Sequence, residues 1–279
     1  MGLISKLIPH LQKYGLRATF KKILWLGATR FNIVDDIVAR KEKINEQLNQ
    51  EFDSTIRYGV LKGYRFPEKS WWSMPDRAGM LLGIYEQELL SDIAAESKDR
   101  KYFVDIGAAD GYYGVGCVSQ GLFERSCCYE ISPEGQETIK ESAALNGVPD
   151  RVEVRGIADR ASIQQLKSWE MSQTIFLIDI EGAEFDILDE ENIKSISGAL
   201  VYVEMHPFKL KDGQEQVEAL KKRLEPYFKI ELIETGARDP SQFSELRLMT
   251  DSDRWLICSE WRSALGEWWK LIPLANSHG

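Results

Sequence analysis

A short apolar strand that ends in a carboxylate and breaks into a glycine-rich turn constrains this chain most. It reads YFVDIGAADGYYG and runs from residue 102 to 114. The strand brings Asp105 to its carboxyl edge, and Gly107 and Gly111 let the backbone turn tightly and approach a ligand. Glu130 follows a second apolar stretch roughly 20 residues later, where α/β nucleotide folds place the carboxylate that binds ribose hydroxyls. The pattern predicts a nucleotide-cofactor site.

The spacing of the glycines disfavours a dinucleotide as the ligand. After Gly107 the next glycines are Gly111 and Gly114, and Ala109 stands where the fingerprint G-x-G-x-x-G has its second glycine. Asp105 at the strand tip would also repel phosphates, whereas it suits a cofactor with an amino group and a sulfonium charge. S-adenosylmethionine carries both groups and is therefore the predicted cofactor.

Two further apolar runs end in acidic residues. The first reads TIFLIDIEGAE and contains Asp179 and Glu181, and the second reads ALVYVEMHP and contains Glu204 and His206. Residues two apart on a strand point to the same side, so each pair can converge on one place. Because parallel strands end at one edge of a sheet, these residues are expected in the same pocket as the glycine turn.

The order of these motifs resembles a known family. VDIGAADGYYG, YEISPE, FLIDIEGAEFDIL and VYVEMH are similar to the motif set of the FkbM-type methyltransferases, a branch of the class I S-adenosylmethionine-dependent enzymes. DIEGAE is the most specific element, and the resemblance covers residues 102–206, more loosely to 262. One departure is that the family usually has Asn where Ala109 or Asp110 stands. The resemblance implies methyl transfer to a hydroxyl, often on a sugar or a polyketide-like metabolite.

The alternation of strands and helices predicts an α/β fold, a Rossmann-like class I methyltransferase sheet with helices on both faces. Two late strands after the fifth match about seven strands in all, mostly parallel with one antiparallel strand near an edge, whereas a dehydrogenase sheet is ordinarily all parallel. Helices are expected at 78–97, 133–146 and 213–224, and the late strands at 228–233 and 254–258.

The distribution of charge and the positions of glycine and proline divide the chain into four parts. Residues 1–44 hold nine basic and three acidic side chains, although the whole chain has a net charge of −9. Apolar residues recur there at helical spacing. The predicted parts are a basic amphipathic helical extension (1–50), a loop-rich and helical segment (51–98), the S-adenosylmethionine-binding domain (99–272) and a flexible tail (273–279). For the segment 51–98 the family resemblance implies the role of a lid over the substrate.

Composition narrows the partners and the compartment. The net charge of −9 disfavours nucleic acid as a partner. Four cysteines in apolar stretches without C-x-x-C spacing indicate reduced core residues. With no membrane span or signal peptide in the sequence, a cytoplasmic protein is expected. The basic helices are candidates for peripheral membrane binding or for docking on a partner, although packing on their own catalytic domain or self-association with a second copy is favoured.

Each predicted site residue has a role in one pocket. Asp105 and the glycine turn are expected to hold the methionine part, Glu130 the ribose and the 157–159 turn the adenine. His206 is the predicted general base because its ordinary pKa is near neutrality. The predicted catalytic residues are His206, Asp179 and Glu204, and the predicted cofactor residues are Asp105, Gly107, Ala108, Asp110, Gly111, Glu130, Ile131, Ala158, Asp159 and Asp179.

Several alternatives stay open at this level. The cluster around His206 could instead hold a divalent cation, which is not favoured from the sequence, so no metal ligand is assigned. The predicted acceptor is a small molecule or glycan, and Trp71 and Trp72, beside Tyr64 and Phe66, could offer its ring an aromatic platform. A non-catalytic cofactor-binding or scaffold protein and a nicotinamide-dependent oxidoreductase are the alternative functions.

Overall fold

The computed structural model describes residues 37–72, 74–166, 168–260 and 267–274. The chain divides into two units, Met1–Lys43 and Ile44–Gly279. The basic helices predicted before residue 37 and most of the predicted tail lie outside the described residues. Pro273, which the sequence assigns to the tail, is the last residue of a strand.

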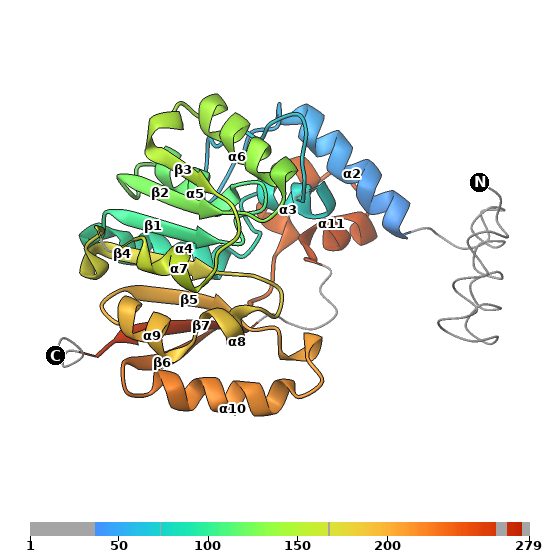
Figure 1. Ribbon diagram of the computed structural model, residues 1–279. Coiled ribbons are helices and arrows are strands. Elements are labelled where there is room, and N and C mark those ends of the chain that lie inside the picture. Colours follow the sequence, from blue (N-terminus) through green and yellow to red (C-terminus); the bar gives the residue numbers. More distant parts are fainter. Residues whose placement is uncertain (1–36, 73, 167, 261–266, 275–279) are drawn as a thin grey trace, which may run out of the picture. The chain divides into compact units, whose positions relative to one another are not determined.

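The second unit is built on one seven-stranded sheet in the order β3-β2-β1-β4-β5-β7-β6 (Figure 1). Strands β1 to β5 are parallel, and β7 is antiparallel to both of its neighbours. This arrangement confirms the predicted Rossmann-like methyltransferase sheet. The strands are β1 (Tyr102–Ile106), β2 (Arg125–Tyr129), β3 (Val152–Arg155), β4 (Thr174–Ile178), β5 (Leu200–Glu204), β6 (Phe228–Glu234) and β7 (Glu267–Pro273).

Helices cover both faces of the sheet, because the central strands are apolar on both sides. On β1, Phe103 packs in the core shared with α4, α5 and α6, whereas Val104 and Ile106 pack in the core shared with α7 to α10. No helix among the described residues is long and apolar enough to cross a membrane. The α-helices are α2 (Ile37–Glu51), α3 (Arg77–Leu81), α4 (Gln87–Glu96), α5 (Tyr112–Ser119), α6 (Pro133–Leu145), α7 (Arg160–Gln164), α8 (Glu184–Ile187), α9 (Glu190–Ile196), α10 (Gly213–Leu224) and α11 (Asp251–Cys258).

Two predicted elements are wrong. Residues 254–258 belong to helix α11 and not to a strand, because the hydroxyl of Thr250 caps the helix by accepting the N–H of Asp253. The last strand is β7. The helix expected at 78–97 is broken between α3 and α4 at Gly83, whose φ is +66°. A Cβ at Gly83 would lie 2.1 Å from the carbonyl oxygen of Tyr58, so only glycine fits this crossing.

Much of the predicted lid segment belongs to the core. Phe52, Ile56, Leu61, Tyr64 and Phe66 are all at most 2% exposed and pack on the sheet face that α5 and α6 cover. The four cysteines are also buried and free of disulfides, as expected from their apolar surroundings. The part of the segment that reaches the site is therefore short.

The strand order reverses between β1 and β4. From β1 the chain continues to β2 and β3 on one side of the sheet, and then β4 and β5 follow on the other side. The loops after β1 and β4 consequently leave the sheet in opposite directions and open a crevice between them. Ligands of open α/β sheets bind at such a crevice.

Candidate active site

A cavity of about 370 Å³ lies at this reversal, beyond the carboxyl ends of β1 and β4. Its volume falls in the range of roughly 300–1,000 Å³ that small-ligand and cofactor pockets occupy. The loops after β1, β2, β3 and β4 all contribute to its wall, together with two tryptophans that precede α3. The lining consists of Trp71, Trp72, Ile106, Gly107, Ala109, Tyr129, Glu130, Ile131, Ile157, Ala158, Asp179, Ile180, Glu181 and Ala183.

The turn after β1 exposes backbone to the cavity. Gly107 has a φ of +92°, and a Cβ there would lie 1.8 Å from the carbonyl oxygen of Asp179. The N–H groups of Gly107 and Ala108 both donate to the carbonyl of Tyr129 at 2.9 Å, which ties the turn to β2. Ala109, the position where a dinucleotide fingerprint has glycine, adopts a φ of +47°. Gly107 thus lies at the cavity wall, where the sequence predicts it.

Glu130 lines the cavity at the end of β2 and is 7% exposed. One of its oxygens accepts the N–H of Ala109 at 2.9 Å, and the other accepts the N–H of Ser132 at 2.7 Å. An ionised carboxylate offers about four acceptor positions, so both oxygens retain capacity for a ligand hydroxyl. The location is that expected for the ribose carboxylate.

The far end of the cavity is apolar. Ile131 and Ile157 are 70% and 63% exposed, and Ala158 lies beside them in the lining. Large apolar side chains left open at a concave site suit a flat aromatic ligand group. Asp159 is a correction: its carboxylate is not in the lining and instead caps α7 by accepting the N–H and the hydroxyl of Ser162 at 2.8 and 2.7 Å.

Asp105 is a second correction, since its carboxylate does not line the cavity. Side chains alternate along β1, and Asp105 points to the face that α5 covers, where it is 0% exposed and accepts the N–H of Gly114 at 2.8 Å. Burial raises the pKa of Asp105 to about 7, although the hydrogen bond from Gly114 works against this rise. Ala108 and Gly111 also lie outside the lining.

Asp110 likewise faces away from the cavity and anchors the tryptophan segment. One of its oxygens accepts the N–H groups of Trp71 and Trp72 at 2.8 and 3.1 Å, and the other accepts the hydroxyl of Ser70 at 2.5 Å. This carboxylate is only 2% exposed. It therefore positions one wall of the site and does not contact the space inside it.

The predicted aromatic platform is reduced to two members. Trp71 and Trp72 line the cavity and are 42% and 57% exposed, whereas Tyr64 and Phe66 are buried. The hydroxyl of Tyr64 bonds that of Ser142 inside the core. The platform role thus stays a prediction for the two tryptophans alone.

The loop after β4 turns sharply within the sequence DIEGAE. Glu181 and Gly182 have φ values of +58° and +111°, and the N–H of Gly182 donates to Glu184 at 2.7 Å. This turn brings the side chains of Asp179, Glu181 and Glu184 toward the end of β5. Glu181 also pairs with Lys209 at 2.5 Å.

These three carboxylates and Glu204 surround His206 and form what we call the His206 cluster. The ring Nδ1 lies 3.2 Å from Glu184, whose carboxylate also accepts the backbone N–H of His206 at 2.8 Å. The ring Nε2 lies 3.6 Å from Glu204 and 3.8 Å from both Asp179 and Glu181. The predicted catalytic residues are therefore brought together, although their roles stay predictions.

Crowding of carboxylates sets the ionisation of the cluster. Burial, together with the charges of Glu204, Glu86 and Glu181, raises the pKa of Asp179 well above its usual value. Burial alone would lower the pKa of His206, but its hydrogen bond to Glu184 and the surrounding carboxylates raise it overall. The cluster consequently favours an added positive charge.

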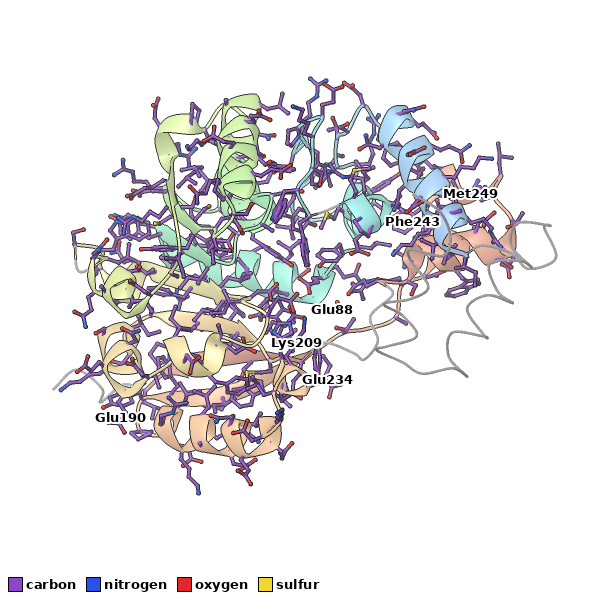
Figure 2. The ribbon with its side chains drawn as sticks, turned by 45° about the vertical axis from the view of Figure 1, so that its right-hand side comes forward. Glu88, Glu190, Lys209, Glu234, Phe243 and Met249 are labelled. Carbon is purple, nitrogen blue, oxygen red and sulfur yellow. The ribbon has the colours of Figure 1, made fainter. Side chains whose placement is uncertain are left out.

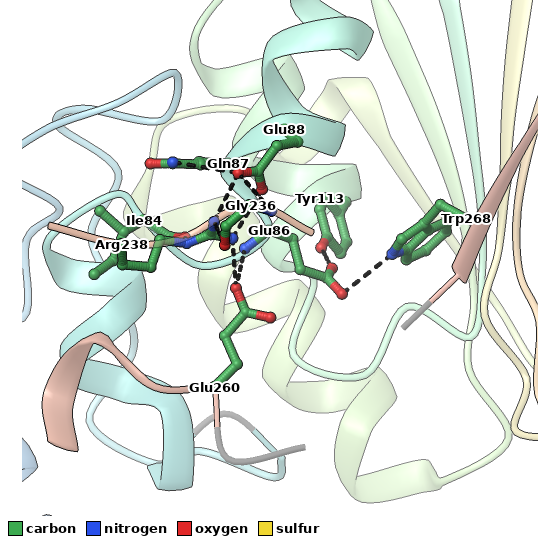
Figure 3. Close-up of polar contacts among 9 residues, drawn as sticks. All are labelled: Ile84, Glu86, Gln87, Glu88, Tyr113, Gly236, Arg238, Glu260 and Trp268. Atoms are coloured by element: carbon green, nitrogen blue, oxygen red, sulfur yellow. Dashed lines mark hydrogen bonds and ion pairs between the residues drawn. The ribbon is translucent and has the colours of Figure 1, made fainter. Parts of the chain in front are cut away.

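Glu86 adjoins this cluster and was not predicted from the sequence. It is 5% exposed, has a φ of +45°, accepts the hydroxyl of Tyr113 and lies 3.3 Å from the indole nitrogen of Trp268 (Figure 3). A left-handed backbone is costly for a side chain other than glycine and tends to occur at functional sites. No motif marks Glu86, so sequence reasoning had no signal for it.

A second network holds the backbone beside Glu86. Arg238 pairs with both oxygens of Glu88 at 2.7 and 2.8 Å and with Glu260 at 2.8 Å, and Glu260 also accepts the N–H of Glu86 (Figure 3).

Glu184 is another residue without a predicted role, although it is the last letter of DIEGAE. Its signal was therefore present in the most specific motif.

Comparison with protein families gives one match, to the Methyltransferase FkbM domain over residues 169–248. The matched residues run from the approach to β4 to the segment after β6 and contain the whole His206 cluster. The match confirms the resemblance to the FkbM-type methyltransferases over these residues. Comparison with curated protein sequences gives no match.

Solved structures with related folds are distant. A protein from Listeria monocytogenes is 13% identical, with 68% of each chain covered and a TM-score of 0.43. Precorrin 8w decarboxylase from Methanobacterium thermoautotrophicum is 15% identical, with 67% of this chain and 89% of that chain covered and a TM-score of 0.44. A tRNA methyltransferase from B. subtilis is 11% identical, with 67% and 65% covered and a TM-score of 0.41. Likenesses at this level carry no argument about the substrate.

Proposed function

We propose that this chain, which carries an FkbM-type methyltransferase domain over residues 169–248, is an S-adenosylmethionine-dependent O-methyltransferase. The proposed acceptor is a hydroxyl of a sugar, a glycan or a related metabolite. The observation that carries the proposal is the junction of two features, because Asp179 and Glu181 belong both to the cavity wall and to the His206 cluster. A cofactor cavity thus opens directly onto proton-accepting groups.

The wall of the cavity suits the parts of S-adenosylmethionine. Glu130 would bind ribose hydroxyls, and Ile131, Ile157 and Ala158 would cover the adenine. Acidic residues at the other end, Asp179 among them, favour the amino group and the sulfonium charge. When bound, this cofactor supplies an electrophilic methyl group whose displacement leaves a neutral thioether.

The acceptor would enter beside the tryptophans. Trp71 and Trp72 are half exposed at the cavity, and Asp110 fixes their backbone. Indole rings held in this way offer a flat apolar surface to the C–H face of a sugar ring. The net charge of −9 and the acidic cluster also favour a neutral or cationic acceptor over a phosphate-rich one.

The chain must position the hydroxyl and take its proton. Fixing the acceptor oxygen in line with the methyl group supplies several kcal/mol by proximity, and a positioned base contributes roughly 10²–10⁴-fold in rate. His206 and the carboxylates of Glu204 and Asp179 are the groups proposed to take the proton. No acid is needed for the leaving group, since it departs neutral.

Calorimetry with the full chain tests the cofactor part of the proposal. We expect S-adenosylmethionine and its demethylated product to bind and NAD not to bind. Ala158→Trp should abolish this binding by filling the adenine end, whereas Ala161→Trp, at a neighbouring exposed position, should leave it intact. Failure of the folded protein to bind S-adenosylmethionine, or tighter binding of NAD, would refute the assignment.

Transfer of a labelled methyl group tests the acceptor part. Panels of sugars, glycans, amines and tRNA should give label only in products whose new bond is a methyl ether. Label in tRNA or on an amine would contradict the proposed acceptor. Cofactor binding without label in any of these would instead favour the non-catalytic alternative.

A further inference from the structure

Three members of the His206 cluster, Asp179, Glu181 and His206, have the geometry of metal ligands. One atom each from Asp179, Glu181 and His206 can be chosen so that all three lie within 4.8 Å of one another. The side chain of His206 is 7% exposed, so its contacts are set by the fold and not by solvent. Three different side chains from two loops therefore converge on a single small volume.

One buried carboxylate oxygen and one ring nitrogen face this volume. The Oδ1 atom of Asp179 is buried and makes no hydrogen bond to any of the described residues. The Nε2 atom of His206 lies 3.8 Å from it and from Glu181, and 3.6 Å from Glu204, which are longer distances than hydrogen bonds allow. Buried polar atoms are normally satisfied, so Oδ1 of Asp179 points to a partner in this volume.

The other ring nitrogen is held as in a metal-binding histidine. Nδ1 lies 3.2 Å from Glu184, which is 0% exposed and also accepts the backbone N–H of His206. When a histidine binds a metal, its second nitrogen ordinarily donates to a carboxylate, which fixes the tautomer and the ring. Glu184 thereby directs the lone pair of Nε2 at Asp179 and Glu181.

We propose that Asp179, Glu181 and His206 form a divalent cation site. Ligands about 2.1 Å from a six-coordinate ion are about 3 Å apart when adjacent and about 4 Å apart when opposite. The observed separations of 3.8 Å between Nε2 and each carboxylate need only a small closure to fit these values. Two carboxylates with one imidazole favour Mg²⁺ or Mn²⁺, and three ligands leave coordination positions open.

The open positions give the cation a role that rests on the proposed methyl transfer. An acceptor hydroxyl bound there would have its pKa lowered. With His206 and Asp179 bound to the cation, Glu204 is the member of the proposed base group that remains to take the proton. The proton of the hydroxyl would pass to Glu204 and then to water, while the hydroxyl oxygen forms a bond to the methyl carbon. The carbon–sulfur bond breaks as this bond forms, and its electron pair stays on sulfur. The charges balance without a redox step.

Lys209 would compete with the cation for the carboxylate of Glu181. Its ammonium lies 2.5 Å from Glu181, but the side chain is 44% exposed and can leave. Binding of a divalent ion would displace Lys209 from that oxygen. Removing its charge should therefore strengthen cation binding, which is the opposite of what removing a structural ion pair does.

The experiment measures Mn²⁺ binding to the full chain by electron paramagnetic resonance and calorimetry, after chelator treatment and without cofactor or acceptor. We expect one bound Mn²⁺ that Mg²⁺ displaces. His206→Gln and Glu181→Gln should each weaken binding at least tenfold, and Lys209→Ala should tighten it several-fold. Glu181 is 44% exposed, so its variant is expected to fold normally even if the His206 variant does not.

The control is Glu190→Gln, which removes one carboxylate from the exposed first turn of α9 (Figure 2). Equal Mn²⁺ affinity in this variant and in wild type supports a specific site. Absence of Mn²⁺ binding at millimolar concentration, or binding that Glu181→Gln leaves unchanged, overturns the proposal. S-adenosylmethionine binding in chelated protein is measured alongside, so a missing metal site is distinguished from a missing cofactor site.

Discussion

Glu184 accepts the backbone N–H of His206 at 2.8 Å and contacts its ring Nδ1 at 3.2 Å, so a single buried carboxylate fixes both the main chain and the side chain of that residue. Its other oxygen accepts the N–H of Gly182. Burial would raise the pKa of Glu184, but these contacts with His206 lower it overall, which keeps the carboxylate ionised. The turn after β4 and the end of β5 are thereby coupled through one side chain.

Replacing this carboxylate by its amide should loosen His206. In Glu184→Gln one oxygen becomes an N–H₂ group that faces a donor, so turnover should fall roughly 10–100-fold, as for other carboxylates that orient a histidine. Cofactor affinity should change little, since Glu184 is not in the cavity wall. Nitrogen NMR of the imidazole reports the tautomer directly. Asp186→Asn, on the exposed side of α8, is the matched control, and an unchanged His206 spectrum would contradict this role.

Asp110 should govern the tryptophan wall. Asp110→Asn removes the charge and one acceptor from a group that holds Ser70, Trp71 and Trp72. Charge-assisted hydrogen bonds are worth about 1.5–3 kcal/mol, so partial loss should weaken cofactor binding by about 5–10-fold. Trypsin should also cleave faster after the exposed Lys69. Unaltered proteolysis, with the exposed Asp150→Asn as reference, would argue against the anchoring role.

Glu130 should contribute to affinity through ribose hydroxyls. Loss of such hydrogen bonds in Glu130→Ala should weaken binding of S-adenosylmethionine by roughly one to two orders of magnitude. An analogue without ribose hydroxyls should bind wild type and Glu130→Ala about equally, because the interacting groups are then absent from both. Glu134→Ala, at an exposed position in α6, serves as the control. A full effect on the deoxy analogue would mean that Glu130 acts only by bracing the loop.

The boundary expected at residue 50 lies inside helix α2. Ile44 and Leu48 are 6% and 0% exposed in the core, and the side chain of Asn45 bonds Met74, Pro75 and Ala78. Losing two buried aliphatic side chains costs about 2–5 kcal/mol each. A chain that begins at Ile37 should therefore remain folded and bind cofactor, whereas one that begins at Gln50 should melt at a clearly lower temperature. Equal melting temperatures would show that α2 is dispensable.

The sequence predicted the sheet well because its central strands are buried on both faces and end in marked loops. The apolar runs before Asp179 and Glu204 became β4 and β5, and the alternation of elements gave the parallel order. The secondary structure near the end of the chain was predicted wrongly, because RWLIC (residues 254–258) is apolar enough for a strand. Its helical state is set by the cap at Thr250, five to eight residues before the apolar residues.

Side-chain direction was the main limit at the site. Side chains alternate between the two faces of the sheet along β1, so Asp105 faces either the cavity or α5 depending on where the strand begins and ends. The sequence motif does not specify that position. Asp110 was assigned to the cofactor because it stands in the glycine loop, yet its partners lie about 40 residues earlier in the chain. Contacts of that range follow from tertiary packing and leave no local signal.

The buried carboxylate of Asp105 predicts a specific dependence of stability on pH. Its pKa is about 7 in the folded protein, chiefly through burial, against about 3.9 in an unfolded chain. The folded state therefore binds more protons between these values, and unfolding becomes easier as the pH rises through this window. The slope is about 1.4 kcal/mol per pH unit, and it vanishes above the folded pKa. Asp105→Asn keeps an acceptor for the N–H of Gly114 but does not titrate. Urea unfolding gives the free energy of unfolding of both proteins at pH 5 and at pH 8. The value for the variant minus the value for wild type should increase by about 2–3 kcal/mol from pH 5 to pH 8, whatever the stability of the variant at either pH. A constant difference between the two proteins would show that Asp105 is ionised in the folded state throughout this range.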